Sequence, residues 1–201
     1  MDFESASPAV VKSIRQRELL NAWLRLYVRD RKLPALAEYQ PSRIEDELPD
    51  LVFFSIDGAQ QPPQIIIDSN GTRMASAYGH TGKGRRLEEY LGPRLAPLVM
   101  PVYHECIHRC LPAFTIAHID DIYGRIVAYE RLLLPFSGDG GTVTHIIGSL
   151  KTISEDGSFE IKNLMRGSDT PPMPKLRTII DRELHHRAPG RIPCGDLLEF
   201  G

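Results

Sequence analysis

Three β-rich segments follow one another with only short polar turns between them, and this arrangement constrains the fold more than any other feature. The segments are AFTIAHID (113–120), RIVAYERLLLPF (125–136) and TVTHIIGSLKTI (142–153), all rich in β-branched or leucine residues. The connections DIYG and SGDGG carry the aspartate and glycine residues that are typical of tight turns. Because tight turns join antiparallel neighbours, the sequence predicts an antiparallel meander.

Two shorter β-rich segments and a long helical region precede this meander. LVFFSI (51–56) and QIIID (64–68) are apolar runs separated by a segment with Gly, Gln and Pro, which is typical of two paired strands. Between residues 71 and 111 the pattern is helical but interrupted by glycines and prolines. We therefore expect several short helices there and one longer helix at about residues 102–111.

An amphipathic helix is expected near the N-terminus. Ser7 is the predicted N-cap, Pro8 takes the first helical position, and Pro34 ends the helix. We expect the helix either to cover the sheet of its own domain or to mediate homodimerisation. The apolar residues behind this expectation are Trp23, Leu24 and Tyr27.

The chain is expected to divide into three parts. Residues 1–35 form the N-terminal helix, and residues 36–153 form the domain that contains all five predicted strands. Residues 154–201 form a C-terminal extension, in which SDTPPMP (168–174) is a predicted linker before a short helix at about 176–187. A length of 201 residues fits one domain with such extensions.

This order of elements is that of the PAS sensory fold, and two segments resemble a narrower group. GTRMASAYGHTGKGRRLEEYL (71–91) is similar to the glycine-threonine-arginine stretch that opens the helical region in a bacterial family of short PAS-like proteins. ERLLLPFSGDGGTVTHIIGSL (130–150) is similar to the fourth strand, the turn and the fifth strand of that family. The resemblance extends over about residues 19–153.

The resemblance implies an α+β fold with a five-stranded antiparallel sheet and a helical crossover. In such a fold the concave face of the sheet and the crossover helices enclose a pocket. The resemblance therefore implies that the chain senses a small molecule or binds a protein partner, and that it is not an enzyme. It implies no particular cofactor. The sequence has no kinase, Walker or DNA-binding motif, so we expect a signal to leave through a homodimer or another protein partner.

Four residues are candidates for the ligand-binding pocket because of their expected positions. Tyr78 and Tyr103 lie in the helical region, and His118 and Tyr129 lie in predicted strands. Each side chain combines a ring with a polar group, which suits it to line a small-molecule site. Ordinary core packing is an equally good interpretation of each residue.

One motif indicates a different chemistry. His104-Glu105-Cys106-Ile107-His108 is an HExxH sequence, which on a helix places two imidazoles on one face to bind Zn²⁺. The longer metzincin pattern fails, because Leu111 and Phe114 occupy its glycine and third histidine positions. A third ligand would then have to be a distant acidic residue such as Asp120 or Glu130.

Two alternative functions follow from this motif. A zinc-dependent peptidase would use His104 and His108 as ligands and Glu105 as the general base. A PAS sensor could instead bind haem or another metal through either histidine. We prefer the sensory interpretation without metal, and the sequence offers no serine or cysteine that can be defended as a catalytic nucleophile.

The cysteines and the remaining histidines are expected to be structural. Cys106 and Cys110 lack the paired CxxC spacing of a closed zinc site and are interpreted as packing residues. His145 is interpreted as a structural or exposed strand residue, and the pair His185 and His186 as exposed residues near the end of the C-terminal helix.

Charge and cysteine content limit the expected partners and compartment. The chain has 24 Lys and Arg against 26 Asp and Glu, so its formal net charge of −2 attracts neither nucleic acid nor an anionic membrane. Three cysteines without a framework spacing, and a first segment without a basic or apolar signal region, predict a cytoplasmic location. The apolar runs are shorter than the ~20 residues that span a bilayer.

Overall fold

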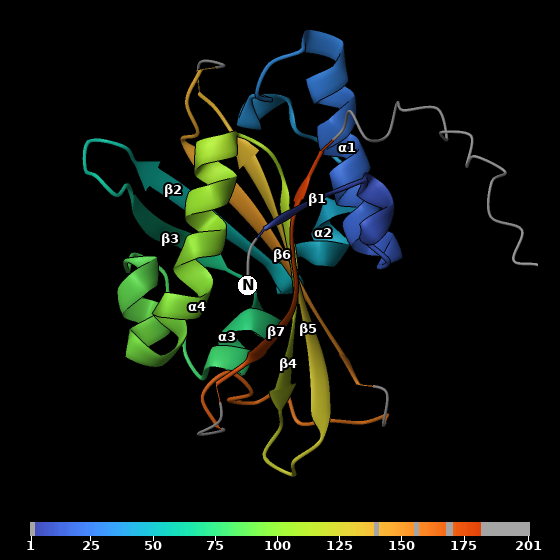
Figure 1. Ribbon diagram of the computed structural model, residues 1–201, viewed down its shortest axis with the longest axis vertical. Coiled ribbons are helices and arrows are strands. Elements are labelled where there is room, and N and C mark those ends of the chain that lie inside the picture. Colours follow the sequence, from blue (N-terminus) through green and yellow to red (C-terminus); the bar gives the residue numbers. More distant parts are fainter. Residues whose placement is uncertain (1–2, 139–140, 155–156, 168–170, 182–201) are drawn as a thin grey trace, which may run out of the picture.

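The computed structural model of the chain describes residues 3–138, 141–154, 157–167 and 171–181. These residues form one mixed sheet with helices on both faces (Figure 1). The strands are β1 (Glu4–Ala6), β2 (Leu51–Asp57), β3 (Gln64–Asn70), β4 (Ala113–Asp120), β5 (Ile126–Phe136), β6 (His145–Ser154) and β7 (Met173–Ile180). The α-helices are α1 (Ile14–Asp30), α2 (Ile44–Glu47), α3 (Thr72–Tyr78) and α4 (Leu87–Arg109), and the 3-10 helices are η1 (Pro8–Val10), η2 (Leu36–Glu38) and η3 (Leu48–Asp50).

The meander and the two earlier strands lie next to one another in the sheet, with β3 at its edge. The strand order is β1-β7-β4-β5-β6-β2-β3, and every neighbouring pair is antiparallel except β1 and β7. The described residues thus form seven strands, and the expectation of five is wrong. β7 extends the sheet beyond β4 and satisfies backbone groups that β4 would otherwise leave unpaired, and β1 pairs in turn with β7.

The strand β7 replaces the first part of the helix expected in the C-terminal extension. Residues 176–180 pair with β4 instead of forming a helical turn. Their sequence, Leu-Arg-Thr-Ile-Ile, suits a strand through its β-branched residues, and Thr178 donates a hydrogen bond to the backbone oxygen of Phe114 over 3.1 Å. The rest of the expected helix, from residue 182, lies outside the described residues.

The N-terminal helix begins later than the sequence predicts. Pro8–Val10 form only a 3-10 turn, and α1 starts at Ile14, where the Ser13 hydroxyl accepts a hydrogen bond from the backbone N–H of Gln16. Trp23 is fully buried, and its indole N–H donates to the backbone oxygen of Pro135 over 2.7 Å. The helix therefore covers the sheet of its own chain, and Trp23, one of the three apolar residues behind the expected dimerisation, is buried there.

A longer helix than expected crosses the opposite face of the sheet. It extends back to Leu87, with one break at Gly92, whose φ of 70° lies in the left-handed region that glycine adopts without strain. Pro93 opens the straight part, where a missing backbone N–H costs no helical hydrogen bond. The later prolines are tolerated because packing against the sheet overrides helix propensity.

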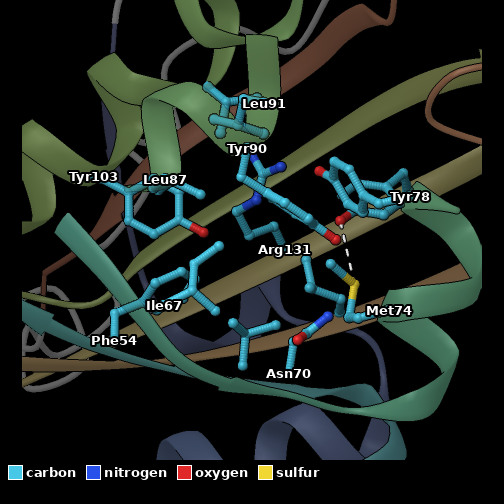
Figure 2. A pocket seen from close by; sticks show the side chains of 14 residues that line it. Phe54, Ile67, Asn70, Met74, Tyr78, Leu87, Tyr90, Leu91, Tyr103 and Arg131 are labelled. Atoms are coloured by element: carbon cyan, nitrogen blue, oxygen red, sulfur yellow. Dashed lines mark hydrogen bonds between the residues drawn. The ribbon is translucent and has the colours of Figure 1, made fainter. Parts of the chain in front are cut away.

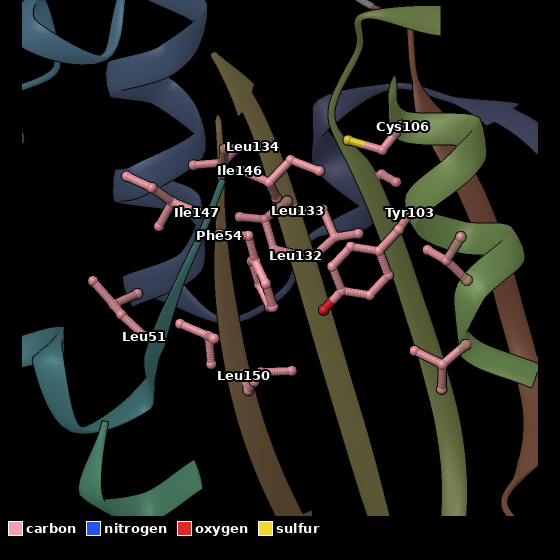
Figure 3. Packing of buried hydrophobic residues seen from close by; sticks show 14 of the residues in the cluster. Leu51, Phe54, Tyr103, Cys106, Leu132, Leu133, Leu134, Ile146, Ile147 and Leu150 are labelled. Atoms are coloured by element: carbon pink, nitrogen blue, oxygen red, sulfur yellow. The ribbon is translucent and has the colours of Figure 1, made fainter. Parts of the chain in front are cut away.

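Alternation along the strands divides the core into two layers. On β5, Leu132 and Leu134 face α1, whereas Leu133 faces α4. Figure 3 shows Tyr103 projecting from α4 toward the sheet, and its ring meets that of Phe54 edge to face at 5.2 Å between centroids. The layer between α4 and the sheet also contains the cavity described next.

Candidate functional site

A small cavity lies between α3, α4 and the concave face of the sheet (Figure 2). Its volume is about 20 Å³, which is enough for one or two water-sized groups. Most of its lining is apolar or aromatic, with a few polar side chains. The lining residues are Val52, Phe54, Ile67, Asn70, Met74, Tyr78, Leu87, Tyr90, Leu91, Val99, Tyr103, Tyr129, Arg131 and Leu150.

The structure brings three of the four candidate pocket residues together. Tyr78 at the end of α3, Tyr103 on α4 and Tyr129 on β5 all line the cavity. His118 does not line it, because its neighbours Ala117 and Ile119 face the α4 side and the alternation of β4 turns His118 to the other face. A ligand-binding role for the three tyrosines stays a prediction.

Tyr90, Tyr103 and Tyr129 in the cavity are neutral phenols at physiological pH. Burial raises the pKa of Tyr103 and of Tyr129 well above the ordinary value of 10.0. Burial likewise raises the pKa of Tyr90, whose hydroxyl donates to the backbone oxygen of His80 over 2.9 Å. The Tyr129 hydroxyl donates weakly to the sulfur of Met74 at 3.7 Å. These side chains therefore offer hydrogen bonds but no negative charge.

Arg131 and Asn70 are polar residues of the cavity that were not among the predicted pocket residues. The side chain of Arg131 points from β5 into the α4 layer, and the residue is only 6% exposed. Its guanidinium carbon lies 5.4 Å from the ring centroid of Tyr129 and 5.9 Å from that of Tyr103, which is cation–π geometry. The spacing of two residues between Tyr129 and Arg131 could have identified it, because such residues share one face of a strand.

The guanidinium of Arg131 is incompletely compensated. Its Nε–H has no hydrogen-bond partner among the described residues. No carboxylate in the described part of the chain forms an ion pair with Arg131. An arginine stays protonated in proteins, so a positive charge is held in the core beside a cavity.

Asn70 supplies a second buried donor at the same cavity. Its side-chain oxygen accepts hydrogen bonds from the hydroxyl of Thr81 at 2.9 Å and from the backbone N–H of Gly82 at 3.2 Å. Because a backbone N–H only donates, the amide oxygen must face Gly82, and this fixes the orientation of the amide. The amide nitrogen is buried, has no partner in the described residues, and points inward in Figure 2.

A second small cavity adjoins Arg131 and Tyr129 on the side of β4 and β7. It measures about 30 Å³ and is lined by Thr115, Ala117, Leu176 and Arg177 among others. The C-terminal extension therefore contributes directly to the surroundings of Arg131. The guanidinium lies between two spaces, and neither contains an acidic side chain in its lining.

The glycine-threonine-arginine stretch that opens α3 is explained by packing and by an ion pair. A Cβ on Gly71 would lie 2.1 Å from the backbone oxygen of Leu48, so only glycine fits there. Arg73 donates to both carboxylate oxygens of Asp50, at 2.7 and 2.9 Å. These contacts fix α3, which carries Met74 and Tyr78 into the cavity.

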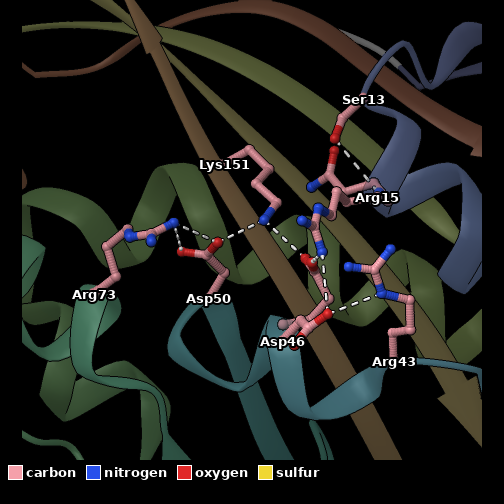
Figure 4. Close-up of polar contacts among 9 residues, drawn as sticks. Ser13, Arg15, Arg43, Asp46, Asp50, Arg73 and Lys151 are labelled. Atoms are coloured by element: carbon pink, nitrogen blue, oxygen red, sulfur yellow. Dashed lines mark hydrogen bonds and ion pairs between the residues drawn. The ribbon is translucent and has the colours of Figure 1, made fainter.

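Asp50 also belongs to a partly buried charge network on the far side of α3 (Figure 4). Lys151 on β6 donates to Asp50 at 2.5 Å and to Glu47 at 2.8 Å. Glu47 in turn accepts from Arg15 of α1 at 2.9 Å. This network connects α3 at the cavity with α1 on the opposite face of the sheet.

The HExxH histidines lie away from the cavity. Neither His104 nor His108 is among the residues that line the two spaces beside Arg131. Glu105 accepts a hydrogen bond from Arg109, one turn later on α4, at 2.6 Å. Within the described ranges, no three His, Cys, Asp or Glu side chains gather in a group that could hold a metal ion, and Asp120 and Glu130 do not join this motif.

Cys106 is fully buried and Cys110 is half-buried, and both thiols are free. Burial raises the pKa of each thiol, which keeps it in the unreactive protonated form. His145 lies on β6. Cys194, His185 and His186 lie outside the described residues.

Comparison with protein families gives a match that agrees with this architecture. A family model described as the PAS domain matches residues 11–151. The chain belongs to the PAS domain family. PAS domains are a class of sensory and regulatory domains that are generally not enzymes. The match confirms the PAS-like family that residues 71–91 and 130–150 indicated.

Comparison with curated proteins and with solved structures finds no significant match. Among the described residues of this PAS domain, no helix combines the length and apolar character needed to cross a membrane.

Proposed function

We propose that this PAS domain senses a small molecule in the cavity beside Arg131 and passes the signal to another chain. One observation supports the proposal most strongly: Arg131, a residue only 6% exposed, has its guanidinium among tyrosine rings, beside a cavity, without a described carboxylate partner. A buried charge without a partner costs folding free energy. A chain that only needed to pack its core would do better with an apolar residue at this position.

The contacts of α3 with both the cavity and the charge network support a sensing role. α3 brings Met74 and Tyr78 to the cavity, and its Arg73 enters the charge network that reaches α1. A ligand that displaced α3 would therefore change contacts on the opposite face of the sheet. We propose that this route connects ligand binding with output.

The proposed output is association with a second copy or with another protein. Ile126 and Ile153 are 53% and 47% exposed on the α1 side of the sheet, beyond the part covered by α1. Exposed apolar side chains on a sheet face are suited to a protein contact. We propose this face, in place of the buried Trp23, as the surface for homodimerisation or partner binding.

The remaining proposals concern organisation, compartment and chemistry. We retain the division into residues 1–35, 36–153 and 154–201 as a proposal, with the extension now supplying a strand of the sheet. The free thiols of Cys106 and Cys110 support a reducing, cytoplasmic location. The unreactive environment of Cys106 supports a non-catalytic role.

Native and denaturing mass spectrometry of the purified full-length chain, with elemental analysis of the same sample, tests these proposals. We expect a retained or exchangeable small molecule without stoichiometric zinc, and a dimer fraction that grows with protein concentration. Stoichiometric zinc that is lost in Glu105→Ala and His104→Ala variants would overturn the sensory proposal in favour of the peptidase.

A further inference from the structure

We infer that the ligand is a compact anion of carboxylate geometry, held by Arg131 and Asn70. This inference rests on the proposed sensing function, because it names the class of ligand for that same cavity. Three properties of the cavity lead to it: the kind of hydrogen-bonding groups it offers, its charge, and its size.

The unpaired polar groups of the cavity are all donors. The Nε–H of Arg131 and the amide nitrogen of Asn70 are buried and have no partner in the described part of the chain. Neither guanidinium nor amide nitrogen accepts hydrogen bonds. The neutral hydroxyl of Tyr103 points inward toward Arg131 in Figure 2 and can also donate. A complementary ligand must therefore present several acceptor atoms.

The charge of the cavity is positive. Arg131 has the rings of Tyr103 and Tyr129 beside it, and cation–π contacts offset only part of the cost of removing a guanidinium from water. The lining supplies no carboxylate to complete the compensation. An anionic ligand would do so. The planar fork of a guanidinium binds carboxylate and phosphate through two parallel hydrogen bonds, and a carboxylate is the smaller of the two groups.

The size of the cavity restricts the anion to a small one. The space that Arg131 and Asn70 both line measures about 20 Å³, and the space on the other side of Arg131 about 30 Å³, so a ligand that contacts both residues has few non-hydrogen atoms. The apolar lining, with Leu91 and Leu150, favours a short aliphatic group over a second charge. Formate, acetate and nitrate are compact planar anions that can be used directly as probes.

Titration of the isotope-labelled full-length chain with sodium formate, sodium acetate or sodium nitrate tests the inference. Sodium chloride at equal ionic strength and acetamide, a neutral molecule of the same shape as acetate, are the reference titrations. We expect saturable shifts in the amide NMR signals around Asn70, Tyr103 and Arg131 with formate or acetate, and no such shifts with chloride. Nitrate distinguishes a general planar anion site from one that requires a carboxylate.

Variants separate the charge from the fold. Arg131→Met should raise the dissociation constant for acetate by about 10- to 100-fold, as expected for the loss of a hydrogen bond to a charged group. Arg25→Met, which removes an exposed arginine from α1, is the matched control and should bind acetate unchanged. Should Arg131→Met fail to fold, Arg131→Lys and Asn70→Ala replace it, and each should weaken acetate binding.

The outcomes distinguish the ligand class from the sensing function. Binding of acetamide at the cavity, with no response to any anion, would overturn the anionic class and leave the sensing function standing. Acetate binding that persists in Arg131→Met and Asn70→Ala would also overturn the assignment of these residues. A cavity that responds to no probe, in a chain that retains no small molecule, would overturn both proposals.

Discussion

At the scale of single residues, the chain places several polar groups in the interior beside the cavity. Arg131 and Asn70 are donors without partners in the described residues, whereas Tyr103 and Tyr129 are phenols kept neutral by burial. A ligand with acceptor atoms would give the two donors hydrogen-bond partners. Alkaline pH would favour the ionised form of the two phenols, which burial disfavours.

The buried tyrosines predict a loss of stability at alkaline pH. Their pKa is raised in the folded chain, so above pH 10.0 the unfolded chain releases these protons first and the free energy of unfolding falls. Each such tyrosine steepens the fall by up to about 1.4 kcal/mol per pH unit. Below pH 10.0 both states keep the proton, and these groups add no pH dependence.

Urea unfolding of Tyr103→Phe at a series of alkaline pH values checks this expectation. The variant should show a shallower fall in the free energy of unfolding than the unmodified chain. Tyr123→Phe is the control, because Tyr123 is 69% exposed and its substitution should leave the slope unchanged. Equal slopes in Tyr103→Phe and the unmodified chain would contradict a buried neutral Tyr103.

At the scale of elements, the charge network decides how α1, α3 and β6 are held together. Lys151 is the only described residue that contacts both carboxylates of the network, Glu47 and Asp50, which are 6% and 5% exposed. Without Lys151 each carboxylate keeps one arginine, Arg15 or Arg73, on its outer side. The inner side of each would then be buried beside another negative charge.

Lys151→Met is therefore expected to lower the free energy of unfolding by about 2 kcal/mol, below the 3–5 kcal/mol of a fully orphaned buried charge. Chemical denaturation at low and moderate salt measures the loss. Arg43→Met is the control, because Arg43 and Asp46 form an exposed pair, with side chains 67% and 48% exposed, that contributes less than about 1 kcal/mol. Similar decreases in the free energy of unfolding in the two variants would show that the partly buried Lys151 stabilises the chain no more than the exposed Arg43 does.

At the scale of the whole molecule, the C-terminal extension packs directly against residues 36–153. β7 covers the edge of β4, and residues 163–165 bind the backbone of α3 through hydrogen bonds from Asn163 to Ser76 and from Met165 to Ala77, each 2.9 Å long. The extension also buries apolar side chains in the core. These are Leu164, Met165, Ile179 and Ile180.

A chain that ends at residue 153 should therefore lose cooperative unfolding. Burial of the four apolar side chains alone corresponds to at least about 6 kcal/mol, which is comparable to the entire net stability of many domains. A chain that ends at Asp181 keeps all of these contacts and should retain cooperative unfolding. Circular dichroism during heating compares the three. Cooperative unfolding of the shorter chain would instead support an independent domain over residues 36–153.

Local patterns predicted the central strands accurately because those strands follow local rules. Residues 113–120 form a strand with the predicted bounds, since β-branched residues between turn-forming segments leave few other conformations open. The capping residue of α1 was predicted wrongly as Ser7, because a 3-10 turn over Pro8–Val10 satisfies the same local signals. Local signals thus identify elements better than they identify their ends.

The site was predicted in part, and for a comparable reason. Tyr78, Tyr103 and Tyr129 meet at the cavity because α3, α4 and β5 pack around it, whereas the register of β4 turns His118 away. Arg131 was overlooked because a charged residue within a strand is ordinarily exposed. Its burial becomes visible only when α4 covers that face of the sheet.

The sequence by itself determined the class of this protein: two strands, a helical region and a meander, with the segments that mark a PAS domain. Those features are encoded in residues near one another in the chain. Only the tertiary structure decided that β7 and β1 complete the sheet and that Trp23 is buried against it. It also decided that Arg131 lies beside a cavity without an ion-pair partner among the described carboxylates. Each of these depends on contacts between residues far apart in sequence, and a side chain's surroundings are set by what packs against it.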